Sequence, residues 1–571
     1  MVNKFIKKGK DFLISPQNSI ISAATVVMMM VLASRALGLV RQRILANYFN
    51  PDDLSLFFAA FRLPDIIFEV LVFGTFSSAF IPVFTKTLKR GKKYSWDIAA
   101  RVVNIGIVIF AVFAFAFSFW AKQIYSLMAP GFDNSQIAEI AAIARIIFLA
   151  QGFFVISYVL TGVLESLRRF LVPALAPIFY NIGIILGTIL LSSKYGLKAP
   201  AIGVVIGAGA HFLIQLPLAY KLGFRFSLAF KPTAGVKKVG RLALPRIIDL
   251  SFDQIGKTVE LYLASFISVA SYTYYTFANS LQLLPVTLFG TSLAKAALPI
   301  LSRKEGNIEE FKKTFLSTVF QAIFFTAPLT VFLIVLRIPI VRLVYGTSIF
   351  DWNSTVQTGL VLTAFALGIV FQSLMAIISR AFFALHDAKT PVVISMIGLV
   401  LLVTGDFILV KGFNIPVWAL AASFSFSAFI EAVLLYTLMN KRLTGLYAFE
   451  NVFKMLKIFV SSTISGFSMY FFLKFFDQYA WVKRISFLSK IEGINFERFV
   501  LDTRYTINLM ILTGIVTLVG LSIYLGLSLL FKVDEVWIFF NMVRRIFLGK
   551  VARVPSKESE PVAPTTTDSN V

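Results

Sequence analysis

The chain contains no cysteine and, among its 571 residues, only two histidines, His211 and His386. Without cysteine it can form neither a disulfide nor a thiolate metal site. The two histidines lie far apart in the sequence, which argues against a histidine-based metal centre and against a Ser-His-Asp catalytic group. Charge is scarce too, since charged residues make up 15% of the chain against about 25% in ordinary globular proteins. We therefore expect no resident cofactor or metal and no enzyme activity.

Apolar side chains are present in excess. They make up 58% of the residues, and the mean hydropathy is +0.81. Soluble cores cannot hide that much apolar surface, whereas a bilayer accepts it. The composition therefore predicts an all-α polytopic membrane protein and excludes an intrinsically disordered chain, a collagen-like repeat and a secreted disulfide scaffold.

The apolar residues fall into fourteen segments that are candidates for transmembrane helices. Several exceed the ~20 residues that cross a bilayer, so we expect them to tilt, kink or protrude. The segments are 19–49, 54–84, 98–120, 137–164, 173–191, 201–220, 241–267, 274–300, 314–336, 354–384, 391–410, 416–439, 458–473 and 505–531.

Basic residues exceed acidic ones by 54 to 29. In a soluble protein this excess would suggest nucleic-acid binding, but in a membrane protein clusters of Lys and Arg in alternate loops set the orientation. The clearest cluster runs from Lys86 to Lys93. The basic start, Met1 to Lys10, resembles a signal peptide, but the apolar run after it continues without a clear cleavage site. We expect a retained first helix, both termini in the cytosol and no nucleic-acid partner.

A faint internal repeat suggests a duplication. Six segments separate the copies, so the copies would share one orientation and form two six-helix lobes around a central cavity, with two extra C-terminal helices. The matching pairs, at nearly constant offset, are Phe73-Gly74-Thr75 with Phe289-Gly290-Thr291, Pro82 with Pro299, and Pro173 with Pro391.

The expected organisation follows from these segments. It is a cytosolic basic start (1–18), an N-terminal lobe (19–222), a cytosolic basic linker (223–240), a C-terminal lobe (241–440), helices 13 and 14 with a long outside loop (441–531), and an interfacial segment with a disordered cytosolic tail (532–571).

Charged residues inside apolar segments are the candidates for function, because they are costly in lipid and usually face a cavity or a partner. The alternative is that they form structural ion pairs between packed helices. The seventh segment carries four on one helical face, the second carries three, and the first has a basic cluster. A cleft between two charged lobes is typical of a transporter, and its basic residues would suit a phosphate. The residues are Asp249, Asp253, Lys257 and Glu260; Arg62, Asp65 and Glu69; and Arg35, Arg41 and Arg43 with Gln42.

Several motifs resemble those of the MurJ/MviN family of lipid II flippases and together cover most of residues 34–440. They are Ser34 to Arg41 (SRALGLVR), Phe57 to Pro64 (FFAAFRLP), Gly74 to Val83 (GTFSSAFIPV), Ala129 to Phe132 (APGF), Pro173 to Pro177 (PALAP) with Asn181, Leu298 to Ser302 (LPILS), Ala381 to Ala384 (AFFA) and Lys389 to Val392 (KTPV).

The resemblance implies a fourteen-helix fold of the multidrug/oligosaccharidyl-lipid/polysaccharide exporter class in the bacterial plasma (inner) membrane. It also implies movement of lipid II, the undecaprenyl-pyrophosphate-linked peptidoglycan precursor, to the outer leaflet by alternating access. Cell-wall synthesis proteins are possible partners. Arg35 and Arg41 match motif arginines of the family's first helix, which suit the pyrophosphate. Candidate substrate-binding residues are Arg35, Arg41, Arg62, Asp65, Glu69 and Lys257.

The chain departs from the family pattern at three positions in the cavity. Phe68 and Ser280 stand where the family has arginines in helices 2 and 8, and Gln42 stands where it commonly has aspartate in helix 1. Arg62 and Lys257 are candidates to replace the missing positive charge. The departures leave open another undecaprenyl-linked glycan or an amphiphile as the substrate.

Some family members have a sodium site between helices 7, 11 and 12, and acidic residues occur on those helices here. Glu260 and Asp406 fall at matching positions for sodium, whereas a proton is the other candidate coupling ion. A structural polar cluster is the alternative to coupling. A different class of function, a non-transporting membrane scaffold for cell-wall enzymes, also stays open. The candidate coupling residues are Asp253, Glu260, Asp406 and Glu431.

Overall fold

The computed structural model describes residues 20–70, 79–89, 91–477 and 505–547. These residues form helices joined by short turns, and the described part of the chain contains no β-strand element. Phe73-Gly74-Thr75, the outside loop beyond residue 477 and the tail beyond residue 547 lie outside the described residues. The prediction of an all-α protein is confirmed.

In the N-terminal half, helices coincide with each of the first six apolar segments, and one further short helix, α6, lies between the third and the fourth. Segment 2 is represented by α3 and α4, on either side of residues that are not described. The helices are α2 (Ile20–Tyr48), α3 (Pro51–Phe68), α4 (Ile81–Leu88), α5 (Lys92–Phe119), α6 (Ala121–Met128), α7 (Asn134–Ser166), α8 (Leu171–Tyr195) and α9 (Lys198–Lys221).

In the C-terminal half, every one of the remaining eight segments is helical, and two further helices, α14 and α22, lie outside the predicted segments. The helices are α10 (Ala234–Ile267), α11 (Ser271–Pro285), η3 (Val286–Thr291), α12 (Ser292–Arg303), α13 (Ile308–Val335), α14 (Arg337–Tyr345), α15 (Trp352–Ala366), α16 (Ile369–Ala384), α17 (Lys389–Phe407), η4 (Ile408–Gly412), α18 (Trp418–Leu443), α19 (Phe449–Phe476), α21 (Thr506–Leu530) and α22 (Glu535–Phe547).

Among the described residues, ten helices are long and apolar enough to cross a membrane, or eleven if the bent pair α15–α16 is one span. The count of fourteen is compatible with this but stays a prediction. One boundary differs, because α10 begins at Ala234 and the end of the expected linker 223–240 is therefore helical. The start of α10 packs against α5, where Gly235 lies beside Ile98.

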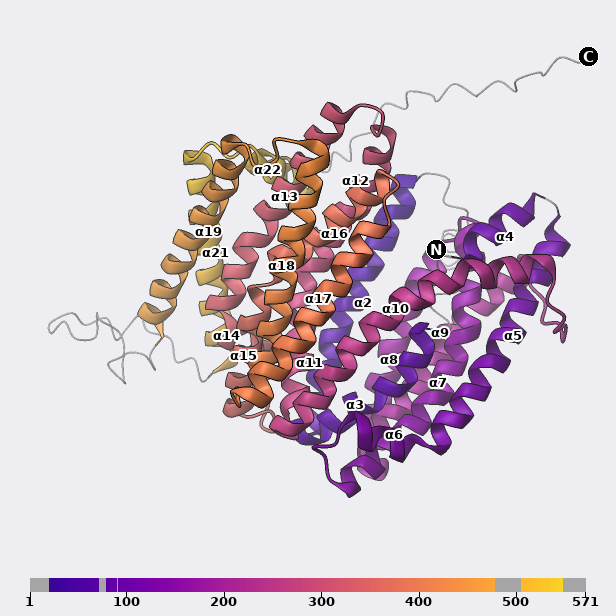
Figure 1. The fold of residues 1–571 in the computed structure, drawn as a ribbon. Coiled ribbons are helices and arrows are strands. Elements are labelled where there is room, and N and C mark those ends of the chain that lie inside the picture. Colours follow the sequence, from indigo (N-terminus) through magenta and orange to yellow (C-terminus); the bar gives the residue numbers. More distant parts are fainter. Residues whose placement is uncertain (1–19, 71–78, 90, 478–504, 548–571) are drawn as a thin grey trace, which may run out of the picture.

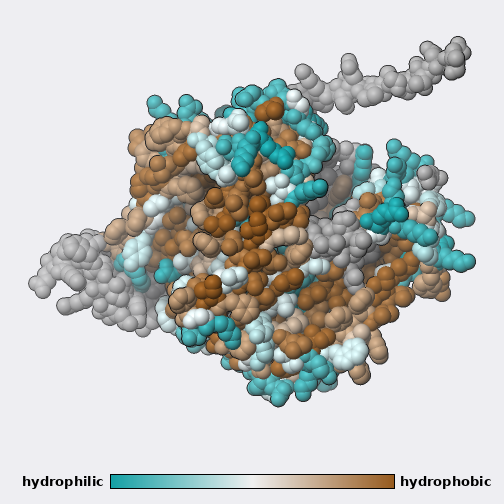
Figure 2. All heavy atoms as spheres, in the orientation of Figure 1, coloured by the Kyte–Doolittle hydropathy of each residue, from teal (hydrophilic) through white to brown (hydrophobic). Residues whose placement is uncertain are grey.

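The helices form two groups with an apolar belt. In Figure 1 the violet helices α3 to α9 gather on one side and the orange helices α13 to α18 on the other, with α10 crossing between them. Figure 2 shows hydrophobic residues across the middle of the molecule and hydrophilic residues at its two ends. This is the distribution that a membrane-spanning protein needs. We refer to the end with the α4–α5 turn as the cytosolic end, as the charge pattern predicts, and to the opposite end as the outer end.

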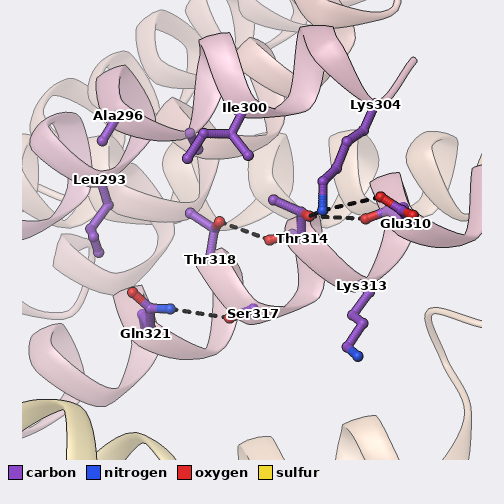
Figure 3. A pocket seen from close by; sticks show the side chains of 11 residues that line it. Leu293, Ala296, Ile300, Lys304, Glu310, Lys313, Thr314, Ser317, Thr318 and Gln321 are labelled. Atoms are coloured by element: carbon purple, nitrogen blue, oxygen red, sulfur yellow. Dashed lines mark hydrogen bonds and ion pairs between the residues drawn. The ribbon is translucent and has the colours of Figure 1, made fainter. Parts of the chain in front are cut away.

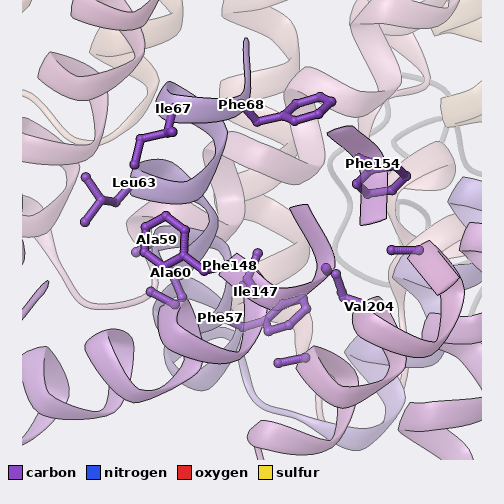
Figure 4. Packing of buried hydrophobic residues seen from close by; sticks show 14 of the residues in the cluster. Phe57, Ala59, Ala60, Leu63, Ile67, Phe68, Ile147, Phe148, Phe154 and Val204 are labelled. Carbon is purple, nitrogen blue, oxygen red and sulfur yellow. The ribbon is translucent and has the colours of Figure 1, made fainter. Parts of the chain in front are cut away.

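Close helix packing holds the N-terminal half together. Gly183 and Gly187 on α8 face Gly203 and Gly207 on α9, so closely that a Cβ at Gly203 would lie 2.7 Å from the Gly183 carbonyl oxygen. Small residues spaced by four let helix backbones approach in this way. Nearby, Phe57 and Leu63 of α3 pack with Ile147 and Phe148 of α7 in a continuous buried cluster (Figure 4). These helices give the site below a rigid wall.

Two helices that line the site are interrupted by wider, π-type turns. One is η3, which follows Pro285 and separates α11 from α12. In the other half, residues 69–70 and 79–80 have the same conformation at the corresponding place after α3. Such π turns are frequently found at functional sites. Their matching positions support the duplication inferred from the repeat.

Candidate functional site

Three adjoining cavities lie between α2, α3, α7, α8, α9 and α11, and Tyr180 of α8 lines all three. The basic cavity, about 510 Å³, contains Arg35, Arg41 and Asn181. The central cavity, about 390 Å³, shares Arg41 and Ser280 with it and adds Arg62 and Asp65. The aromatic cavity, about 360 Å³, is lined by Asp65, Glu69, Phe154, Tyr158, Tyr180 and His211. Together they form a polar cleft inside an apolar protein.

The two motif arginines of α2 lie at this cleft. Arg35 is exposed in the basic cavity. Arg41 lies deeper and donates a 2.9 Å hydrogen bond to Asn181 Oδ1, while its Nε is buried without a partner among the described residues. A buried guanidinium N–H without an acceptor is costly, and a phosphate oxygen would supply the acceptor. The structure thus places both motif arginines in the lining of one cavity.

Two of the departures from the family pattern contact each other. Gln42 Nε2 donates a 2.8 Å hydrogen bond to Ser280 Oγ, and Tyr345 OH donates a 2.9 Å bond to Gln42 Oε1. The resemblance would place aspartate and arginine at positions 42 and 280. A neutral amide–hydroxyl pair occupies these two positions and links α2 to α11 without charge.

A polar chain joins α3 to α10 across the cleft. Arg62 donates to Gln254, and Gln254 in turn donates to Glu69. Lys257 Nζ lies 3.1 Å from Glu69 Oε2 in an ion pair whose side chains are partly exposed. Arg62 and Lys257 therefore converge near Glu69, where Gln254 and Glu69 already engage them. Gln254, which links the charges, was not singled out in the sequence because it is neutral.

Asp65 lies one helical turn from Arg62 and from Glu69, on the same face of α3, and it also contacts α7. Its Oδ1 accepts a 2.8 Å hydrogen bond from Gln151 Nε2 of α7, and it lines both the central and the aromatic cavity. His211, which also lines the aromatic cavity, is buried and its Nδ1 lies 2.6 Å from Ser157 Oγ.

The candidate coupling residues lie around a separate cavity of about 480 Å³ between α10, α16, α17 and α18. Asp253, Lys257, Glu260 and Glu431 line it. Glu431 accepts a 3.1 Å hydrogen bond from Ser427 and interacts electrostatically with Asp253. Asp249 lies on α10, and its side chain is outside the described part of the structure.

Glu260 and Asp406 form a second acidic pair deeper in the C-terminal half. Glu260 is hydrogen-bonded to Tyr275 of α11 and interacts electrostatically with Asp406. Asp406 is fully buried near Ser423 of α18, and neither of its carboxylate oxygens has a hydrogen-bond partner within 3.5 Å among the described residues. The structure thus brings Glu260 to Asp406, and Glu431 to Asp253. The expected convergence of Glu260, Asp406 and Glu431 is not seen, since the described residues contain no group of three carboxylates that could hold a metal ion.

A further groove, about 560 Å³, lies outside the cleft between α12 and α13. In Figure 3, Lys304 reaches toward Thr314 and Glu310, with distances of 3.1 Å to Thr314 Oγ1 and 3.4 Å to Glu310 Oε2. Its cation is thus already paired.

Several contacts between the two halves lie at the outer end. Ser55 at the start of α3 hydrogen-bonds Thr273 at the start of α11 at 2.9 Å. Arg43 at the end of α2 donates a 2.7 Å bond to the Leu343 carbonyl of α14. Gly131 N donates a 3.1 Å bond to Ser265 Oγ near the end of α10. The halves are therefore joined at the outer end of the cleft.

Comparisons with known proteins agree with this architecture. A family model described as lipid II flippase MurJ matches residues 45–491. The probable lipid II flippase MurJ of Thermotoga maritima is 28% identical over 437 residues, covering 76% of this chain and 86% of the relative. The corresponding protein of Vibrio cholerae is 28% identical over 457 residues, covering 76% and 85%.

Solved structures share the fold. A lipid II flippase MurJ in an inward closed conformation has a TM-score of 0.72 at 24% identity, covering 89% of this chain and 99% of its own. An inward-facing multidrug resistance MATE family transporter has a TM-score of 0.61 at 14% identity, covering 74% and 98%. At these identities the likeness concerns the fold alone.

Proposed function

This chain belongs to the MurJ family of lipid II flippases, and on that premise we propose that it moves lipid II from the inner to the outer leaflet of a bacterial plasma membrane by alternating access. Both termini lie in the cytosol. The headgroup occupies the polar cleft while the lipid tail stays in the bilayer. No covalent step is required, so the protein acts as a transporter.

The observation that carries the proposal is a cleft lined by charged residues, at whose outer end the two halves of the protein are in contact. Arg35 and Arg41 line its basic cavity, and the unpartnered Arg41 Nε supplies a donor for the pyrophosphate. The contacts of Ser55, Arg43 and Gly131 join the halves at the outer end. In this state the headgroup is received from the inner leaflet, and separation of these contacts releases it outside.

Coupling to an ion resets the transporter in this account. Asp406 is buried with no hydrogen-bond partner within 3.5 Å among the described residues, and Glu260 is its electrostatic neighbour. A sodium ion or a proton between them would neutralise a charge that is otherwise costly inside a membrane protein. The membrane potential adds to this driving force for any charge that moves. Glu260→Gln should leave folding intact and reduce ion-dependent flipping, and unchanged flipping would remove the coupling role.

A second candidate substrate is another undecaprenyl-linked glycan or an amphiphile. The observation in its favour is that Phe68 and Ser280 replace two cavity arginines expected from the resemblance, so the cleft has less positive charge for a pyrophosphate. Arg62 and Lys257 compensate only in part, because Gln254 and Glu69 already engage them.

Complementation tests the proposal. Cells depleted of their own lipid II flippase would receive the native chain or an Arg35→Ala, Arg41→Ala variant, and growth would be scored together with arrival of lipid II in the outer leaflet. We expect rescue by the native chain and failure of the variant at equal abundance in the membrane. Absence of rescue by correctly inserted native protein favours the other lipid-linked substrate. Rescue by the variant favours the scaffold.

A further inference from the structure

The aromatic cavity is a box of rings inside the N-terminal half. Phe154 of α7 packs edge-on against Tyr180 and His211, with ring centroids 5.3 and 5.1 Å apart. Phe68 lies 5.3 Å from Tyr158 in a tilted arrangement. The ring faces of tyrosine and phenylalanine carry partial negative charge and attract cations. The proposed transport of a pyrophosphate does not use this box.

Two carboxylates and an unpartnered amide oxygen complete the lining. Asp65 and Glu69 stand one helical turn apart on α3. Gln151 donates to Asp65 through Nε2, but its Oε1 is buried without a hydrogen-bond partner among the described residues, and the residue is only 5% exposed. A buried acceptor beside a carboxylate needs a donor. The cavity thus offers acceptors and rings to a ligand with N–H groups.

Nearby basic residues leave one negative charge in the cavity without an ion pair. Lys257 pairs with Glu69 from the α10 side. Arg62 attracts Asp65 electrostatically, but its hydrogen bond goes to Gln254. No Lys or Arg lines the aromatic cavity, and none forms an ion pair with Asp65 in the part of the chain that is described. Position 68, where the resemblance would place an arginine, holds a ring instead.

We propose that the aromatic cavity binds an ammonium group, with Asp65 and Gln151 Oε1 accepting its N–H hydrogen bonds and the rings surrounding it. The cavity adjoins the central cavity through Asp65 and Tyr180, and the basic cavity lies beyond. One ligand can therefore place an anion at Arg41 and a cation at Asp65. The identity of the ammonium rests on the proposed function: the ammonium belongs to the headgroup of the lipid-linked substrate. This chain therefore selects headgroups with a free amine.

Two lipids that differ only in the amine test the proposal. One is lipid II with a free amino group in its peptide, and the other is the same lipid with that amine acetylated. Binding to the full chain in phosphatidylglycerol nanodiscs would be measured for the native protein, for Asp65→Asn and for Glu139→Gln. Glu139 is a carboxylate of α7 that does not line the cavity. Thermal unfolding of each variant would establish that it is folded.

Acetylation should weaken binding to the native chain and to Glu139→Gln by about tenfold, the scale of a desolvated cation–π and charge-assisted contact. In Asp65→Asn the two lipids should bind within about twofold of each other. Equal binding of both lipids by the native chain would overturn the assignment to the substrate.

A separate probe distinguishes this proposal from the proposed function. Labelled butylammonium should bind the native chain and lose most of its binding in Asp65→Asn, whether or not lipid II binds. Absence of that difference would overturn the ammonium site itself. If phosphatidylethanolamine in the nanodisc displaces butylammonium while acetylation of lipid II has no effect, the ammonium comes from the membrane lipid, and selection of the substrate amine is refuted.

Discussion

Replacing Gly131 by alanine should open the outer end of the cleft. Gly131 lies in the turn between α6 and α7 and packs directly on the backbone of Ser265 near the end of α10. A Cβ there would overlap Ser265 and approach the Phe266 nitrogen to 2.7 Å. Backbone atoms cannot rotate aside as a side chain can, so the joined halves must separate to relieve the overlap.

The size of this effect follows from the cost of overpacking, about 1–3 kcal/mol. That cost applies to the state in which the outer ends are joined and disappears when they separate. At about 1.4 kcal/mol for each factor of ten, the ratio of joined to separated molecules should fall about 5- to 150-fold. The unperturbed ratio sets how much of this change an assay detects.

The absence of native cysteine makes the assay direct. A single cysteine placed at Thr276, which lines the central cavity, would be labelled from outside the cell by a membrane-impermeant maleimide. Gly131→Ala should speed this labelling at least fivefold. Gly209→Ala is the matched control, because a Cβ at Gly209 meets nothing within 4 Å. Unchanged labelling in a folded Gly131→Ala protein would refute the idea that this contact holds the outer end closed.

The remaining predictions concern the cleft, the helix packing and the cytosolic surface. Arg41→Ala should slow flipping roughly 10- to 100-fold in proteoliposomes by removing a charge-assisted phosphate contact, with partial recovery in Arg41→Lys; full activity in the alanine variant would contradict this role. Gly203→Leu should lower the stability of the detergent-solubilised protein by about 1–3 kcal/mol in thermal unfolding, and a wild-type transition would show that the α8–α9 contact is loose. Asp387, in the α16–α17 turn, accepts hydrogen bonds from Thr390 and pairs with Arg442, which lower the pKa of its carboxyl. Its contribution to stability should therefore be present above about pH 4 and be lost as the pH falls through the lowered pKa, and Asp387→Asn should flatten that acid dependence of the unfolding temperature.

Apolar patterning was sufficient to predict the helices, because long runs of apolar residues leave few alternatives in a bilayer. It could not predict η3, η4 or the 40° bend between α15 and α16, which depend on local backbone geometry rather than on periodicity. Gly203 and Gly207 pack closely on α8, whereas an added Cβ at Gly209 on the same helix would meet nothing within 4 Å. The spacing of glycines along a helix does not by itself reveal which of them face a neighbouring helix.

The charged residues of the candidate site could be predicted from the sequence, because charge is rare inside apolar segments. Its neutral residues could not. Lys257 and Glu260 are on one face of α10, yet Lys257 pairs with Glu69 of the other half while Glu260 turns to Tyr275 and Asp406. Such partners belong to helices far away in the sequence. Gln254 gave no signal of its own, although its position one turn before Lys257 would place it near the same cleft.

The pairing of Gln42 with Ser280 shows how two departures from a family pattern can be coupled. The resemblance would place aspartate at position 42 and arginine at position 280, and both residues are uncharged here. Replaced together, they keep a 2.8 Å hydrogen bond between α2 and α11. The lost positive charge therefore has a structural explanation that does not require the whole cleft to have changed its substrate.

Transport by the purified chain tests most directly whether this protein moves lipid II across the bilayer. Proteoliposomes would carry lipid II in the inner leaflet only, and its appearance outside would be followed with an external enzyme or label that cannot cross the bilayer. We predict that lipid II appears in the outer leaflet only when the native chain is present, and that the Arg35→Ala, Arg41→Ala variant does not move it. Intact, correctly folded native protein that leaves lipid II in the inner leaflet, with an ion gradient and a membrane potential applied, would contradict this prediction.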